Sequence, residues 1–341
     1  MALITGTAWN DVLYGTAFAD TIQGLGGNDT VYAGAGADYV SGSTGTDYLY
    51  GEDGNDDLRG GDDADFLMGG YGADYMYGDA GNDYIVSGVG SSWDGLVDTI
   101  YGGDGIDTWE VDFSGYGAAI NVAIPASSAT IVYTAYANFI GIEVLTLGGS
   151  SYNDLIYGGA YSDQIYGWYG DDGLTGGGGD DRLYGESGAD SLLGNDGADT
   201  LYGGDGGDYL IGENGNDYLY GEAGADTMQG INGADQMWGG ASNDVYLYYS
   251  LADSSVASGG RDRINDFATG DVVDLSMLDA NSAVGGNQAF AFAAGAAANS
   301  VWAVTAGGVT SVFADVDGNA TADFQIDLTN AYVAGAGDFI L

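Results

Sequence analysis

The chain has 341 residues and a formal net charge of -47, because only four Lys and Arg residues face 51 Asp and Glu residues. This charge excludes nucleic acid as a partner, since binding phosphates requires Lys and Arg. His and Cys are both absent from the sequence, which excludes imidazole-based catalysis, the usual zinc sites and disulfides.

The first feature along the chain is an Asp residue that recurs every nine positions. One array spans residues 11–83 and is followed by two in-phase Asp residues within 98–107; a second array spans residues 154–244. A hydrophobic residue stands two positions after each Asp, and Gly usually stands five and two positions before it. Residues 212–220, GENGNDYLY, therefore fit the nonapeptide G-G-x-G-x-D-x-U-x, with Glu213 in place of the second Gly. We call the in-phase acids the aspartate ladder.

Each nonapeptide predicts a tight turn followed by a short strand. Gly supplies the positive φ angles of the turn, and the middle residue of the strand points inward. Two units make one 18-residue coil, and stacked coils form two parallel sheets with strands about 4.8 Å apart. We therefore predict an all-β protein: two parallel β-rolls (1–108 and 149–246), a small β insertion between them (109–148) and a C-terminal β domain (247–341).

Residues 109–148 leave the nine-residue period. Segments such as AAINVAI and GIEVLTL alternate or run hydrophobic as strands do, and they predict a small insertion that joins and caps the two rolls. The alternative is a catalytic carboxylate pair formed by Glu110 and Glu143, which nothing in their spacing requires.

Residues 247–341 are rich in Ala, and here we expect the nine-residue Asp phase to be absent. One acidic segment has two interpretations. Asp315, Asp317, Asn319 and Asp323 add a calcium loop, or Asp317-Gly318-Asn319 is a plain hairpin turn.

Ladder residues 18 positions apart lie above one another on one edge of the roll. Carboxylates about 5 Å apart repel each other by roughly 1 kcal/mol even in water. Summed over both arrays, this repulsion rivals the ~5–15 kcal/mol by which a typical domain is stable. The metal-free fold should therefore not form.

A hard dication between the turns reverses the sign of this interaction. Ca²⁺ accepts several carboxylate and carbonyl oxygens in a flexible shell, whereas Mg²⁺ demands stricter geometry. The alternative, that Asp merely caps turns, accounts for one or two residues but not for an in-phase array. The predicted calcium ligands are Asp20, Asp29, Asp38, Asp47, Asp56, Asp65, Asp74, Asp83, Asp107, Asp163, Asp172, Asp181, Asp190, Asp199, Asp208, Asp217, Asp226, Asp235 and Asp244.

Some units depart from the pattern two positions before the Asp. The first two units of each array carry an aromatic residue there, and we interpret them as caps with incomplete sites, because terminal repeats lack one neighbour. Two further units also replace this Gly, by Asp63 and Ser242, and Trp93 replaces the Gly five positions before Asp98, so we expect incomplete occupancy there. The aromatic residues are Trp9, Phe18, Tyr152 and Tyr161.

The repeats resemble the repeats-in-toxin (RTX, haemolysin-type) family. This resemblance implies a parallel β-roll in which Ca²⁺ lies between the turns of successive coils, held by ladder carboxylates and turn carbonyls. Segments 260–278 and 312–330 resemble the C-terminal domain of serralysin-type secreted proteases, and the final residues DFIL resemble that family's uncleaved type I secretion signal.

These resemblances imply export by a type I secretion apparatus and a secreted, extracellular or cell-surface location. The amino terminus has no basic start or apolar core segment, so we expect no Sec signal peptide. Folding coupled to calcium suits passage through a channel in the unfolded state. No apolar run approaches the roughly 20 residues that a membrane span needs.

An aromatic residue also recurs every 18 positions, one place after the inward hydrophobe. The predicted stripe is Tyr166, Tyr184, Tyr202, Tyr220 and Trp238, pointing outward from one sheet. One interpretation is β propensity with stacking along the sheet, or burial under a neighbour. The other is a flat platform for sugar rings or for a second copy of the chain.

We predict a non-enzymatic, calcium-folded secreted protein with a structural or adhesive role in a surface layer, a biofilm matrix or cell attachment. No catalytic domain of the resembling families is recognisable beside the repeats. Two alternatives remain open: an effector acting on host membranes, and a polysaccharide-binding or polysaccharide-modifying protein. The alginate epimerases carry similar repeats as accessory modules of a catalytic domain.

Overall fold

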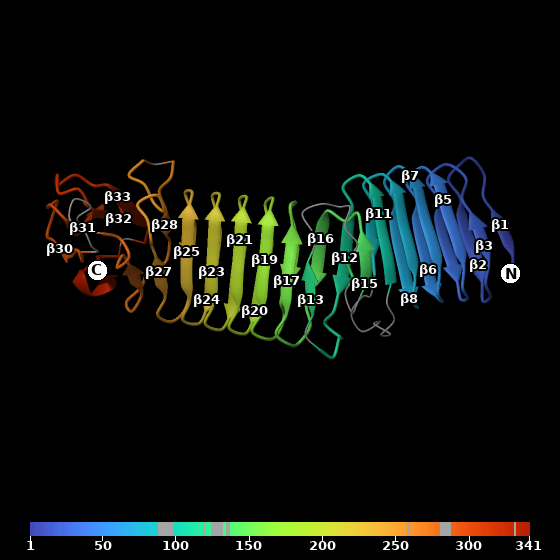
Figure 1. The fold of residues 1–341 in the computed structure, drawn as a ribbon, viewed down its shortest axis with the longest axis horizontal. Coiled ribbons are helices and arrows are strands. Elements are labelled where there is room, and N and C mark those ends of the chain that lie inside the picture. Colours follow the sequence, from blue (N-terminus) through green and yellow to red (C-terminus); the bar gives the residue numbers. More distant parts are fainter. Residues whose placement is uncertain are drawn as a thin grey trace. The chain divides into compact units, whose positions relative to one another are not determined.

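A computed structural model describes residues 1–87, 98–118, 120–123, 132–133, 137–257, 259–279, 288–330 and 332–341. They form two compact units, Met1–Tyr166 and Gly167–Leu341, each built from stacked coils of short β-strands (Figure 1). The predicted all-β parallel β-roll is therefore confirmed. The boundaries that we placed at 108, 148 and 246 stay a prediction.

The first unit contains two stacks of parallel strands, and in each stack a strand pairs with the strand one coil away. One sheet has the order β1 (Leu3–Thr5), β3 (Thr21–Gln23), β5 (Tyr39–Thr44), β7 (Asp57–Asp62), β9 (Tyr75–Ala80), β11 (Asp98–Asp104), β15 (Ala137–Ile140) and β14 (Val132–Tyr133), of which only β14 is antiparallel to its neighbour. The other has β2 (Val12–Thr16), β4 (Thr30–Gly34), β6 (Tyr48–Asp53), β8 (Phe66–Tyr71), β10 (Tyr84–Val86), β12 (Thr108–Asp112), β16 (Val144–Gly148) and β18 (Gln164–Tyr166). A shorter pair joins β13 (Asn121–Ala123) to β17 (Leu155–Gly159).

The second unit repeats this plan. One sheet comprises β19 (Gly173–Gly178), β21 (Ser191–Asp196), β23 (Tyr209–Asn214), β25 (Thr227–Asn232), β27 (Val245–Leu247), β29 (Val272–Asp274) and β34 (Phe339–Ile340). The other comprises β20 (Arg182–Ser187), β22 (Thr200–Asp205), β24 (Tyr218–Ala223), β26 (Gln236–Trp238), β28 (Arg263–Ile264) and β33 (Phe324–Leu328). It continues through the antiparallel strands β32 (Val309–Ala314) and β31 (Ser300–Ala306) to β30 (Ala291–Phe292), and a short 3₁₀ helix, η2 (Ala336–Asp338), precedes β34.

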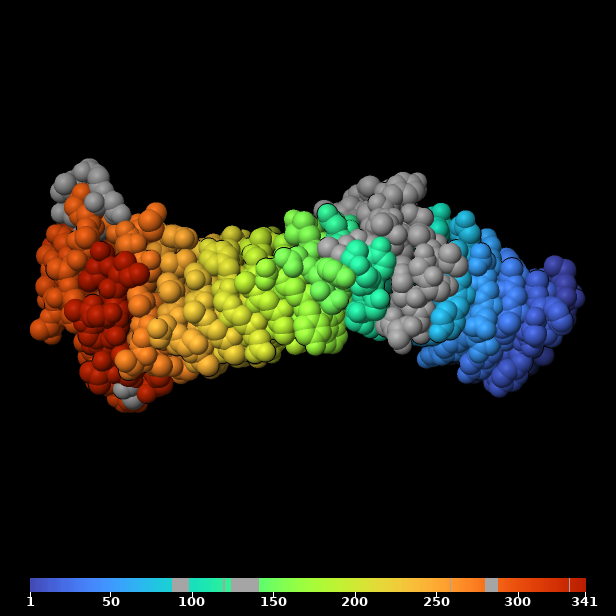
Figure 2. Space-filling model, turned by 90° about the horizontal axis from the view of Figure 1, so that it is seen from below, coloured from blue at the N-terminus to red at the C-terminus, as the bar shows by residue number. Residues whose placement is uncertain are grey.

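The core of the nonapeptide coils is two rows of inward side chains, one from each sheet. Strand pairing sets residues 18 positions apart side by side, as in Leu183 with Leu201, and these inward residues are fully buried. The neighbouring positions on the same strand are only partly covered, as the alternating pattern of β22 shows. Figure 2 shows the coils of each unit as successive bands in sequence order. A core this thin leaves the turns as the place where additional stabilisation is needed.

The C-terminal segment departs from our expectation that the nine-residue phase stops at residue 246. Asp253, Asp262 and Asp271 continue the phase from Asp244. Strands β28 and β29 begin directly after Asp262 and Asp271 and pair in parallel with β26 and β27. The expectation was wrong because strand pairing tolerates the loss of the surrounding Gly residues, which had made the unit recognisable.

Candidate metal centre

The Gly two positions before a ladder Asp lies where successive coils touch. Gly54 has a φ of +154°, and a Cβ atom there would lie 1.4 Å from the carbonyl oxygen of Gly36, one coil earlier. Trp9 and Phe18 hold the equivalent position in the first coil, and their side chains are 79% and 71% exposed. An aromatic residue is tolerated there because no described coil precedes it, in agreement with a capping role for these two units. The same interpretation was wrong for Tyr152 and Tyr161, because β17 and β18, the strands that follow them, pair with the preceding strands β13 and β16.

Hydrogen bonds connect the ladder from coil to coil. One carboxylate oxygen, Oδ1, accepts the backbone N–H of the ladder residue 18 positions earlier. The N–H of Asp38 donates to Oδ1 of Asp56 at 2.8 Å, and that of Asp208 donates to Oδ1 of Asp226 at 2.9 Å. Each side chain is thus held in one orientation, with its second oxygen turned into the turn region.

The second carboxylate oxygen, Oδ2, is buried in these turns and therefore needs a partner. All of the predicted ligands are buried. Within the described residues, Oδ2 has no hydrogen-bond partner in Asp29, Asp38, Asp47, Asp56, Asp65, Asp83, Asp107, Asp190, Asp199, Asp208, Asp217, Asp226, Asp235 and Asp244. A buried anionic oxygen without a partner costs several kcal/mol or more unless a proton or a cation neutralises it.

These oxygens converge over the Gly five positions before each Asp. A Cβ atom on Gly60 would lie 2.3 Å from Oδ2 of Asp65 and 2.8 Å from the carbonyl oxygen of Gly78. Gly194 has the same surroundings, 2.3 Å from Oδ2 of Asp199 and 2.8 Å from the carbonyl oxygen of Gly212. Hard oxygen donors from two successive coils thus surround a space that only Gly leaves open, and this donor set fits Ca²⁺.

Burial makes these carboxyl groups weak acids in the absence of metal. It raises the pKa of Asp56 to about 7, and that of Asp65 and Asp217 to about 8. The backbone hydrogen bond to each group acts in the opposite direction but is the smaller effect. Protons and cations therefore compete for the same oxygens near neutral pH.

Asp20 differs from the other predicted ligands, because hydrogen bonds already satisfy its Oδ2. The backbone N–H and the hydroxyl of Thr16 donate to it at 2.8 and 2.7 Å, and the hydroxyl bond lowers the pKa of Asp20. Asp11 and Asp154 receive the same pair of contacts from Thr7 and Ser150; in Ser150 the hydroxyl bonds the other oxygen. A hydroxyl residue four positions before the Asp thus takes the place left open in the interior turns.

The structure adds ladder residues that our ligand prediction omitted. Asp98, Asp262 and Asp271 accept the backbone N–H groups of Asp74, Asp235 and Asp244 at 3.0, 3.0 and 3.1 Å. All three lie in the nine-residue phase or follow its slip, so the spacing itself was the signal that could have found them.

Glu143 also takes a ladder position. Its Oε2 accepts the backbone N–H of Asp107 at 3.0 Å, whereas Glu110 accepts the hydroxyl of Tyr84. The two glutamates of the hypothetical catalytic pair therefore have separate partners. Trp93 lies outside the described residues.

The acidic segment near the C-terminus forms the loop between β32 and β33. One carboxylate oxygen from each of Asp315, Asp317 and Asp323 lies within 4.8 Å of the others. Oδ1 of Asp315 also accepts the backbone N–H groups of Asp317 and Gly318, at 3.1 and 2.8 Å. The arrangement is a hairpin turn that carries an acidic cluster, so it agrees with both interpretations.

The aromatic stripe of the second unit is a stack of half-buried rings. Tyr184, Tyr202, Tyr220 and Trp238 follow one another at centroid distances of 4.9, 4.8 and 4.6 Å, with interplanar angles of 2°, 8° and 13°. Rings that lay side by side in one plane could not have their centroids this close together. The rings therefore stack face to face along the sheet, and each covers part of its neighbour. A role as a binding platform stays a prediction. Tyr166 belongs to the first unit.

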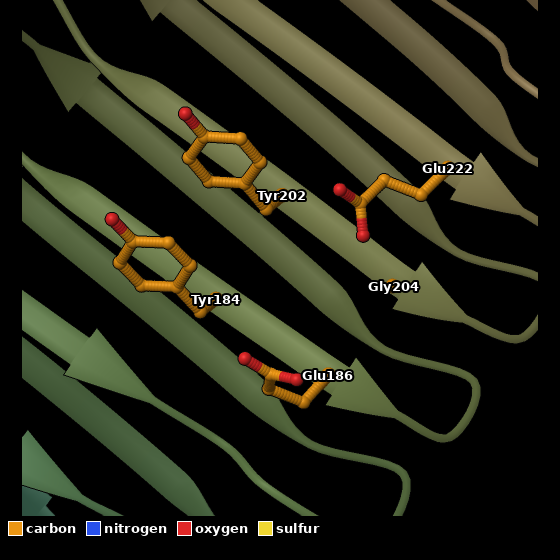
Figure 3. A pocket seen from close by; sticks show the side chains of 5 residues that line it. All are labelled: Tyr184, Glu186, Tyr202, Gly204 and Glu222. Carbon is orange, nitrogen blue, oxygen red and sulfur yellow. The ribbon is translucent and has the colours of Figure 1, made fainter.

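A shallow pocket of about 250 Å³ lies beside this stack. Tyr184 and Glu186 come from β20, Tyr202 and Gly204 from β22, and Glu222 from β24 (Figure 3). Gly204 leaves a gap between the two carboxylates. Burial and the nearby charge of Glu186 raise the pKa of Glu222.

Comparisons with known proteins agree with this geometry. The family model described as peptidase M10 serralysin C terminal matches residues 71–341, well over half of the chain. The chain belongs to the serralysin C-terminal family. The model of the RTX calcium-binding nonapeptide repeat matches residues 5–40 and 32–67. This serralysin C-terminal family member therefore carries RTX repeats, and its cofactor is Ca²⁺, as predicted.

Among solved structures, this family member is similar to two subunits of a mannuronan C5-epimerase from Azotobacter vinelandii. The R3 subunit is 28% identical, with a TM-score of 0.34, covering 43% of this chain and 80% of its own. The R2 subunit is 23% identical, with a TM-score of 0.30, covering 53% of this chain and 91% of its own. No curated protein matches the chain. Across the described residues, no helix is long and apolar enough to cross a bilayer.

Proposed function

We propose that this chain is a calcium-folded, exported protein with a structural or adhesive role, in a surface layer, a biofilm matrix or cell attachment. The observation that carries the proposal is the row of buried carboxylate oxygens without partners, repeated from coil to coil. Membership of the serralysin C-terminal family supports export by a type I apparatus and an extracellular or cell-surface location.

The proposed ligands of each interior site are ladder carboxylates and the carbonyl oxygens of the turns. The predicted ligands Asp29 to Asp244 supply Oδ2, and a Gly of the next coil supplies a carbonyl, as with Asp65 and Gly78. A bound Ca²⁺ supplies positive charge between carboxylates that otherwise repel one another. Because the coil is needed to gather these oxygens, binding and folding are one process.

A structural role is supported by how each unit is built. Its nonapeptide coils repeat one geometry, and each of their strands contributes one hydrophobic side chain to the core. Metal ions in the turns therefore contribute rigidity that the core alone does not supply. Calcium outside the cell would switch the exported chain from a flexible polymer to a stack of fixed coils.

Two measurements test this proposal. Circular dichroism at pH 8, with and without a chelator, should show the β signal only when calcium is present. Light scattering should then show ordered assembly on calcium addition. A β signal unchanged by chelator contradicts calcium-dependent folding, and a compact monomer at all calcium concentrations contradicts the structural role.

The pocket beside the aromatic stack favours a second candidate function, the binding of a polysaccharide. Sugar hydroxyls donate to carboxylates such as Glu186 and Glu222, and ring edges of Tyr184 and Tyr202 offer apolar contact. The carboxylates favour a neutral or cationic sugar over a polyanion. Glycan binding that is lost in Glu222→Gln, with the β signal retained, supports this function; equal binding by the variant contradicts it.

A further inference from the structure

Strand β27 carries two inward tyrosines at the place where the nonapeptides end. Tyr246 and Tyr248 are 0% and 1% exposed. Within the described residues neither hydroxyl makes a hydrogen bond of ordinary geometry, although the Tyr248 hydroxyl faces the Asp262 carboxylate and the Tyr246 hydroxyl faces the backbone of Gly239. Buried hydroxyls satisfied this poorly point to a ligand that the protein atoms do not provide.

The Tyr246 hydroxyl stands where earlier coils place a carbonyl oxygen. Over Gly221, a Cβ atom would meet Oδ2 of Asp226 at 2.4 Å and the carbonyl oxygen of Gly239 at 2.7 Å. Over Gly239, one coil later, it would meet Oδ2 of Asp244 at 2.2 Å and the Tyr246 hydroxyl at 2.6 Å. The phenol oxygen thus takes the position of the carbonyl in this last nonapeptide.

The Tyr248 hydroxyl lies among acids on the other edge of the roll. Oδ2 of Asp235 and Oδ2 of Asp262 have no hydrogen-bond partner in the described part of the chain, and both residues are fully buried. A phenol is uncharged at neutral pH, so this hydroxyl offers a neutral oxygen beside the two carboxylates.

The ladder also ends at this level. Oδ1 of Asp262 accepts the N–H of Asp235 at 3.0 Å, but the N–H of Asp262 donates to the Ser254 hydroxyl at 2.9 Å instead of to a further carboxylate. On the other edge, Oδ1 of Asp271 accepts the N–H of Asp244, and its Oδ2 accepts the N–H of Ala268 at 2.7 Å. The row of carboxylates that accept ladder N–H groups therefore ends at Asp262 on one edge and at Asp271 on the other.

We propose that the segment after the nonapeptides builds two further calcium sites that close the ladder, one from Asp235, Asp262 and Tyr248, the other from Asp244 and Tyr246. This inference rests on the proposed calcium binding of the interior turns and names the ligands at their end. At the first site, two carboxylates balance the charge of one dication. The phenol then completes the shell without adding negative charge, as a carbonyl does in the interior.

The test counts calcium ions retained by the full chain after passage through calcium-free buffer. Tyr248→Phe and Tyr246→Phe each remove one oxygen and keep the buried ring, so the core remains packed. We expect each variant to keep its β signal and to bind one ion about tenfold more weakly, so that one fewer ion is retained. Tyr202→Phe, in the outward stack, is the matched control and should retain the parent number.

Asp262→Asn provides an independent arm, with Asp205→Asn, an exposed acid on β22, as its control. We expect Asp262→Asn to lose one retained ion and Asp205→Asn to lose none. Equal retention by Tyr248→Phe, Tyr246→Phe and Asp262→Asn overturns the inference while the proposed function stands. A parent chain that retains no calcium contradicts the proposed function itself. If Asp262→Asn does not fold, the tyrosine variants still decide.

Discussion

The first coil and the interior turns differ in what partners Oδ2 of the ladder Asp. In the first coil, Thr16 donates both its N–H and its hydroxyl to Oδ2 of Asp20. In the interior turns of Asp56 and Asp217, Glu52 and Glu213 stand four positions before the Asp in place of a hydroxyl residue, and Oδ2 is left without a partner. The comparison teaches that a turn of this type needs either a hydroxyl donor or a cation, and that the interior depends on the cation.

Calcium removal should give the largest difference in stability between the interior coils and the first coil. With a chelator at neutral pH, we expect the interior coils to lose their β structure, because their carboxylates lose the positive charge that holds them together. Circular dichroism measures the loss, and hydrogen exchange locates it. Protection of the Asp56 and Asp217 turns that persists in chelator contradicts a dependence on the cation.

A ladder substitution should be the next largest effect, and it should depend on calcium only in the interior. Asp217→Ala removes Oδ2 and also the acceptor of the Asp199 N–H, which leaves a buried donor unsatisfied at a cost of roughly 1–3 kcal/mol. We expect weaker calcium binding and a lower melting temperature in calcium. For Asp20→Ala we expect a loss of stability without a change in the calcium midpoint. Calorimetry at several calcium concentrations compares the two variants.

Acid should substitute for calcium in part. The folded, metal-free pKa values of about 7 for Asp56 and about 8 for Asp217 lie above the ordinary value of 3.8, so the folded form binds more protons than the unfolded form in this range. Its stability therefore falls as pH rises from about 4 to 8 and increases on acidification. In chelator, the β signal should strengthen from pH 8 to pH 5, and calcium affinity should weaken over the same range. An affinity independent of pH argues against these carboxylates as ligands.

The smallest expected effect concerns the hydroxyl cap. Thr16→Val keeps the β-branched shape and the backbone N–H but removes the hydroxyl bond to Asp20. We expect a fall of roughly 2–4 °C in melting temperature, and no change in the calcium midpoint. Thr30→Val, on the neighbouring strand β4, is the control for the same change elsewhere. A shift in the calcium midpoint in Thr16→Val alone indicates that Asp20 also takes part in metal binding.

Much of the fold could be predicted from the nine-residue period alone, because every nonapeptide forms the same turn and short strand. The phase of Asp56 and Asp217 with their neighbours predicted coils, parallel sheets, inward hydrophobes and a calcium-dependent edge. The same reasoning missed Asp262 and Asp271, since we looked for Gly beside each Asp and stopped where Gly was lost. The phase continued there because strands β28 and β29 pair by backbone hydrogen bonds, which do not require Gly.

The amino-acid sequence by itself determined the coil, its register and the kind of ion that its oxygens suit, because these depend on contacts repeated every 18 residues. Only the tertiary structure decided how each carboxylate is used. The N–H of the previous coil occupies one oxygen, while Thr16 satisfies the other in Asp20 and burial leaves it open in Asp217. The stacking of Tyr184 on Tyr202 and the placement of the Tyr246 hydroxyl were decided in the same way. These outcomes depend on which side chain of the next coil lies within contact distance, and the nine-residue spacing alone does not determine those contacts.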